Sequence, residues 1–105
     1  PVAARSGGLV CAWHGGAVVA VSFVEVVGER AHVRHLWVDP QHRRRGVARM
    51  LLSERLRVAR NADCTTVMAV AAPAWAPVLR ESGFRSVRMR GRYEILRYDW
   101  SEHAG

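Results

Sequence analysis

The hydrophobic pattern changes its period in the middle of the chain, and this change constrains the fold more than any other feature. Residues 31–38 are predicted to form a third strand, and Asp39-Pro40 ends it because proline lacks the N–H that a sheet ladder requires. From Gly46 to about Arg60 the period becomes helical, with apolar residues at Ala48, Leu51, Leu52, Leu56 and Ala59. The opposite face of this helix is polar and carries Arg49, Ser53, Arg57 and Arg60. The segment therefore predicts a strand, a short basic loop and an amphipathic helix in direct succession.

The sequence on either side of this unit predicts further short strands and one more helix. Gly15-Gly16 separates two apolar runs, which indicates a hairpin between strands at 9–14 and 17–27. After the first helix we expect a buried strand at 64–71, a helix at 73–82 that stops at Gly83, and strands at 84–89 and 93–98. Residues 1–8 end in Ser-Gly-Gly and predict a flexible lead-in. The result is one α/β domain of the α+β kind over residues 1–105, with the order β-β-β-α-β-α-β-β.

Charge and composition narrow the classes of function. The net charge is +7, and all sixteen basic residues are Arg, whose planar fork grips phosphate and carboxylate at two points. This favours an anionic ligand such as nucleic acid, lipid or a phosphorylated cofactor, although the charge alone is equally consistent with a role in solubility. Neither the two Cys nor the five His have the spacing of a metal site, so no metal is expected. The longest apolar stretch, at 17–24, is too short to span a bilayer, and a cytoplasmic location is the default expectation.

The loop between the strand predicted at 31–38 and the helix that begins at Gly46 has residues suited to binding an anion. A helix N-terminus presents N–H groups without intrahelical partners and a partial positive charge. Gly46 lets the backbone approach a bulky group because it has no Cβ, and Arg43, Arg44 and Arg45 precede it directly. Taken together these residues predict a diphosphate bound at the start of the helix. The alternative interpretation is a solvated basic turn followed by a flexible joint.

The same segment resembles the acetyl-CoA signature of the GNAT superfamily of N-acetyltransferases, V-x-P-x-x-R-x-x-G-x-A. The matching residues are Val38, Pro40, Arg43, Gly46 and Ala48, and Glu81-Ser82-Gly83-Phe84 resembles a later helix-to-strand junction of that family. The resemblance implies a mixed, mostly antiparallel central sheet and acetyl-CoA as cosubstrate. It also implies that main-chain groups of Leu36, Trp37 and Val38 pair with the pantetheine arm, as an added strand would. The amides of Arg43, Arg44, Arg45, Gly46, Val47 and Ala48 would then cradle the pyrophosphate, and two strands would splay apart to admit the cofactor.

The chain departs from the family pattern in three places. The family's first strand and two helices are missing, so we expect a homodimer or a piece of a longer chain to complete the domain. The positions at which many members carry an Asn and a Tyr acid hold Ala72 and Leu79. Some family members carry a Glu base on the strand predicted here at 31–38, six residues before the Val of the signature. That position holds His32, which we interpret as the general base because imidazole changes its charge near neutral pH. The alternative is that His32 is a half-exposed strand residue without a catalytic role.

The function that follows is transfer of the acetyl group of acetyl-CoA to a primary amine by direct attack. The alternatives are a catalytically inactive GNAT-like acyl-CoA-binding or regulatory module, and a nucleic-acid binder, for which no signature is present. Because the chain is strongly basic, we expect a small-molecule or peptide amine whose carrier is neutral or anionic. Trp37 and Trp75 are expected beside the cofactor cleft, either in the core or as walls of the acceptor pocket. Arg85, Arg88, Arg90 and Arg92 are either a solvated face or a surface for an acidic acceptor.

Overall fold

The structure is a computed structural model that describes residues 2–6, 9–42 and 46–103. Its elements are β1 (Val2–Ser6), β2 (Leu9–His14), β3 (Ala17–Val27), β4 (Arg30–Val38), η1 (Pro40–His42), α1 (Val47–Asn61), β5 (Thr66–Ala71), α2 (Ala76–Glu81), β6 (Arg85–Arg90), β7 (Tyr93–Asp99) and η2 (Trp100–Glu102). The predicted α+β class and the order of elements from residue 9 onward are confirmed.

The N-terminal prediction was wrong for most of its length. Residues 1–8 were predicted to be a flexible lead-in, but Val2–Ser6 form β1, which pairs antiparallel with β2 from Val2↔Trp13 to Ser6↔Leu9. The segment is short and rich in small residues, so its own pattern gives little strand signal. Pairing with the neighbouring strand supplies the backbone partners instead, and such context routinely overrides local propensity. The second helix is also shorter than predicted, because Ala72 to Trp75 form a turn in which Trp75 N–H donates to the Ala72 carbonyl at 2.9 Å.

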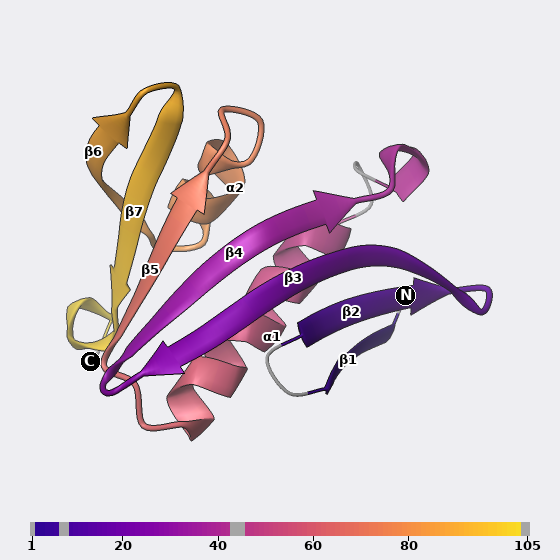
Figure 1. The fold of residues 1–105 in the computed structure, drawn as a ribbon, viewed down its shortest axis with the longest axis horizontal. Coiled ribbons are helices and arrows are strands. Elements are labelled where there is room, and N and C mark those ends of the chain that lie inside the picture. Colours follow the sequence, from indigo (N-terminus) through magenta and orange to yellow (C-terminus); the bar gives the residue numbers. More distant parts are fainter. Residues whose placement is uncertain (1, 7–8, 43–45, 104–105) are drawn as a thin grey trace.

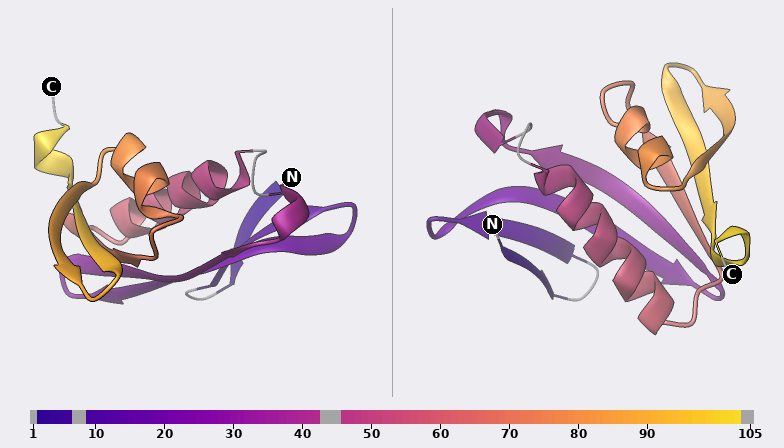
Figure 2. Two further views of the ribbon diagram at one scale, coloured as in Figure 1. Left: turned by 90° about the horizontal axis from the view of Figure 1, so that it is seen from above. Right: turned by 180° about the vertical axis from the view of Figure 1, so that it is seen from behind.

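Within the described residues the sheet has seven strands in the order β1-β2-β3-β4-β5-β7-β6, of which only the β4–β5 pair is parallel (Figure 1). Both helices lie on one side of it (Figure 2). The buried face of α1 packs on β2, β3 and β4 through Val47, Ala48, Leu51, Leu52, Val58 and Ala59. Side chains alternate between the two faces of a strand, so on β3 Ser22 and Val24 face the helix while Phe23 is exposed on the other side. Large apolar groups thus lie uncovered on the face away from α1, among them Trp13, Phe23 and Trp37.

The two parallel strands separate part of the way along their length. Pairing between β4 and β5 runs from Arg30↔Thr66 to Val33↔Ala69 and stops there, although β4 continues to Val38 and β5 to Ala71. On its other edge β4 carries a bulge, because the register with β3 shifts between Val21↔Trp37 and Phe23↔Arg34. A bulge bends a strand and increases its twist. Figure 1 shows the consequence, since the C-terminal half of β4 turns away from β5 and leaves an opening in the middle of the sheet.

Candidate functional site

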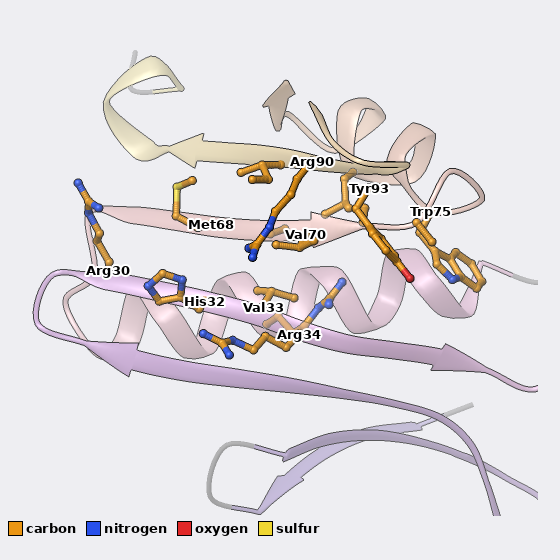
Figure 3. A pocket seen from close by; sticks show the side chains of 15 residues that line it. Arg30, His32, Val33, Arg34, Met68, Val70, Trp75, Arg90 and Tyr93 are labelled. Atoms are coloured by element: carbon orange, nitrogen blue, oxygen red, sulfur yellow. The ribbon is translucent and has the colours of Figure 1, made fainter. Parts of the chain in front are cut away.

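A pocket of about 650 Å³ lies at the opening between β4 and β5 (Figure 3). Its walls come from both strands, from α1 and α2, and from the β6–β7 hairpin. Residues from both faces of the sheet contribute, because the strands no longer touch beyond Val33 and Ala69. The splayed pair therefore brings residues of both faces of the sheet around one pocket.

His32 lies at the narrow end of this opening and lines the pocket. It is half-buried, and it stands between Glu25 on β3 and Met68 on β5 in the ladder. Strand alternation places it on the face away from α1, because its neighbours Ala31 and Val33 are buried on the other face. A titratable imidazole at the end of a pocket is a suitable group to accept a proton from a ligand held there.

The wide end of the pocket carries two aromatic residues, Trp75 at the start of α2 and Tyr93 at the start of β7, which Figure 3 shows close to each other and far from His32. Trp75 was predicted beside the cleft, but Trp37 is not among the residues that line the pocket. Ala72 and Leu79 do line it, so the positions compared with the family's Asn and Tyr face the ligand space with apolar side chains. Tyr93 was missed by the sequence analysis, because its place opposite β5 depends on strand pairing.

The helix that starts beside the opening begins at the predicted glycine. Gly46 is the N-cap of α1, with φ 72° and ψ 10°, and its carbonyl accepts the first helical bond from Met50 N–H at 3.0 Å. A Cβ added at Gly46 would meet no atom of the described residues within 4 Å, apart from its chain neighbours, so the space in front of it is open on their side. The side chains of Val47 and Ala48 are buried in the first turn, where the main-chain N–H groups of a helix have no intrahelical partner. Arg43, Arg44 and Arg45 lie outside the described residues.

The main-chain candidates on β4 follow the last pair with β5. Leu36 lies at the bulge of β4, and Trp37 and Val38 end the strand next to η1. The Trp37 side chain is 45% exposed and Val38 is fully buried. The Asp39 carboxylate lies 2.9 Å from His42 Nδ1, and Asp39 N–H donates to the Val19 carbonyl at 2.7 Å. The segment that follows β4 is therefore hydrogen-bonded to β3. These bonds fix the position of the chain from Asp39 to His42.

Four arginines line the pocket, and no acidic residue does so among the described residues. Arg30 and Arg34 come from β4, Arg90 from β6, and Arg55 from the buried face of α1. Figure 3 shows Arg90 extending from the hairpin toward Val70 on β5. Arg55 was missed by the sequence analysis, although it stands four residues after Leu51 and three after Leu52 and so falls on the apolar face of the helix.

In the described part of the chain no group of three or more His, Cys, Asp or Glu side chains is placed to hold a metal ion. No helix found there has both the length and the apolar character needed to cross a membrane.

A mixed sheet that opens between two parallel strands, with a glycine-started helix beside the opening, is the arrangement expected for the acetyltransferase class. The chain matches the model of the acetyltransferase (GNAT) family over residues 2–84. It therefore belongs to the GNAT acetyltransferase family, as the signature at residues 38–48 predicted.

Solved structures give the same fold. The PaiA N-acetyltransferase of Thermoplasma acidophilum, solved with coenzyme A, superimposes with a TM-score of 0.80 at 12% identity, over 87% of this chain and 59% of that one. The N-acetylglutamate synthase of Neisseria gonorrhoeae, solved with coenzyme A and N-acetyl-glutamate, gives 0.77 at 18% identity, over 88% of this chain and 25% of that one. The GNAT domain of S. lividans PAT gives 0.77 at 25% identity, over 87% and 59% of the two chains. The chain thus spans between 25% and 59% of the length of these proteins, and by sequence no curated protein matches it.

Proposed function

We propose that the protein is an N-acetyltransferase that moves the acetyl group of acetyl-CoA to a primary amine by direct attack. One observation carries the proposal: the pocket at the opening between β4 and β5 is lined by His32, a side chain that can accept a proton. The start of α1, where the diphosphate would bind, follows the end of β4 that turns away from β5. Family membership and the coenzyme A held by two of the compared structures support the choice of cosubstrate.

The residues divide the work between binding and proton transfer. Amides of Gly46, Val47 and Ala48, with the preceding arginines 43–45, would hold the diphosphate at the helix start. Main-chain groups of Leu36, Trp37 and Val38 would pair with the pantetheine arm along the edge that β4 turns away from β5. Bound acetyl-CoA supplies an activated acetyl thioester. His32 would accept the proton that the amine loses, directly or through a water, and most of the acceleration would come from holding the two reactants together.

A second candidate is an acyl-CoA-binding or regulatory module without catalysis. It is favoured by Ala72 and Leu79, because these apolar side chains line the pocket where many family members carry an Asn and a Tyr acid. Tyr93 is the only described phenol that lines the pocket, and Figure 3 places it at the end far from His32. The transferase predicts turnover and the binding module does not, whereas both predict that the protein binds acyl-CoA.

An amine panel followed by CoA release separates these candidates and tests the acceptor class. Because four arginines and no described carboxylate line the pocket, we expect turnover with amino-acid-type amines, or with a peptide N-terminus in an acidic context, and little with spermine or an aminoglycoside. Release of CoA from none of the amines would favour the binding module. A strong preference for spermine or an aminoglycoside would overturn the acceptor class while leaving the transferase intact.

We also propose that a partner covers the exposed face of the sheet in the functional protein. This partner is either a second copy, in a homodimer, or further sequence of a longer chain, and the protein acts in the cytoplasm. Trp13, Phe23 and Trp37 are between 42% and 46% exposed on that face. Apolar patches of this kind commonly mark an interface.

A further inference from the structure

Arg55 is a charged group in a place where charge is costly. It lies on the face of α1 that packs against the sheet, among Leu51, Leu52 and Val58, and only 2% of it is exposed. A buried ion loses its hydration, and this loss is normally offset by an opposite charge at close range. Arg55 has none among the described residues, which include all nine acidic side chains of the protein.

The hydrogen bonds of the Arg55 guanidinium are incomplete as well. Its Nη1 donates to Ser22 Oγ at 2.7 Å, and Ser22 Oγ in turn donates to the Arg34 carbonyl at 3.2 Å beside the bulge of β4. The buried Nε has no hydrogen-bond partner in the part of the chain that the structure describes. Burial lowers the pKa of Arg55 to about 9, so the group keeps its positive charge at neutral pH. The Ser22 bond therefore fixes the orientation of the guanidinium without neutralising it.

The same side chain lines the pocket at the opening between β4 and β5. Arg30, Arg34 and Arg90 line the pocket too. Arg34 Nη2 lies 3.6 Å from the Glu25 carboxylate, but both side chains are exposed, so solvent screens this ion pair. A molecule in the pocket is thus surrounded by positively charged side chains. At the buried wall of the pocket it meets the Arg55 guanidinium, which is shielded from water. Arg binds carboxylate with two parallel bonds, and such bonds are strongest where water is excluded.

We propose that Arg55 binds a carboxylate of the molecule that reacts in this pocket and so determines its specificity. The inference rests on the proposed acyl transfer and names its substrate class. The carboxylate belongs either to the amine, as in an amino acid, or to the acyl group, as in a dicarboxylic acyl-CoA. Both sources present the same chemistry to the Arg55 guanidinium.

Paired substrates distinguish the two sources. In one arm, acetyl-CoA is supplied with an amino acid or with its carboxamide; in the other, an uncharged amine is supplied with succinyl-CoA or with butyryl-CoA. We expect the wild-type protein to prefer the carboxylate in one arm, through KM, and the Arg55→Met variant to lose that preference by about 100-fold, as when one partner of a buried charge pair is removed. The Arg55→Lys variant should recover part of it at most, because Lys cannot form the fork. Arg57→Met is the control, since Arg57 is an exposed arginine of α1 that pairs with Glu54 outside the pocket.

Stability and a direct binding readout separate this role from a structural one. Because the charge is unpaired, replacing Arg55 with Met should leave Tm unchanged or raise it by a few degrees, whereas an arginine that holds the fold together would lower Tm on removal. In NMR, the Arg55 Nε–H resonance of the wild-type protein should shift on titration with glutarate. Equal activity losses with the acid and the amide, a preference that survives in the Met variant, or an Nε–H resonance that glutarate leaves unmoved would each overturn the proposal. If CoA release is absent with every substrate while glutarate still moves the resonance, the carboxylate site stands and the transferase proposal fails.

Discussion

The Gly46→Asn variant is expected to bind acetyl-CoA about 100-fold more weakly than the wild-type protein while keeping its fold. Gly46 has φ 72°, in the left-handed region, and Asn is the side chain that tolerates this region best after glycine. The backbone is thereby preserved, but a Cβ and an amide now fill the open space in front of the helix start. Losing one or two charge-assisted bonds to the diphosphate corresponds to about a hundredfold change in Kd. Calorimetric titration with acetyl-CoA measures it.

A matched substitution exists elsewhere in the chain. Gly28, in the turn between β3 and β4, has φ 61° and likewise no atom within 4 Å of an added Cβ. Gly28→Asn therefore places the same side chain in the same backbone conformation at the other end of β4 from the start of α1, and its affinity for acetyl-CoA should equal that of the wild type. If Gly46→Asn binds acetyl-CoA as tightly as Gly28→Asn does, the diphosphate does not lie at the start of α1.

The second large effect is expected at His32. The His32→Ala variant should turn over about 100-fold more slowly with its best amine, because a positioned base contributes a factor of this size. Its Kd for acetyl-CoA should stay within a factor of about two, since His32 lies at the end of the pocket remote from Gly46. The measurement is steady-state CoA release together with calorimetry on the same preparations.

His32→Gln is the informative companion because it keeps a polar side chain of similar size and removes only the ability to act as a base. Both variants should lose turnover to the same extent. A rate close to wild type in His32→Gln but not in His32→Ala would assign His32 a positioning role through hydrogen bonding. A wild-type rate in both would remove it from the mechanism.

Local patterns in the sequence were sufficient for the central part of the fold. The bounds of β2 and β3 coincide with the predicted ones, because Gly15-Gly16 marks the hairpin and the alternation on either side is clear. The start of α1 was also correct, since the strand-ending proline and Gly46 are local signals. What depends on distant partners was missed: β1 exists because β2 pairs with it, and the turn before α2 shortens that helix at its start.

The candidate site likewise has residues that local sequence patterns predict and residues that depend on distant partners. The helix start at Gly46 and the strand position of His32 could be predicted, because each depends on a few consecutive residues. The opening between β4 and β5 was implied by the family resemblance and not by any spacing, since it requires a bulge and a loss of pairing between strands. Arg55 and Tyr93 reach the pocket from α1 and β7, and neither could be placed without the packing of these elements on β4 and β5.

An NMR titration of ¹⁵N-labelled protein with acetyl-CoA tests the central claim most directly, because it reports binding and location together. Saturable shifts should be largest at the amides of Gly46, Val47 and Ala48, and should continue through Leu36, Trp37 and Val38 at the end of β4. The residues of the β2–β3 hairpin should move little. Absence of saturable shifts, or shifts confined to the arginine-rich hairpin of β6 and β7, would contradict the assignment of an acetyl-CoA site to the opening between β4 and β5.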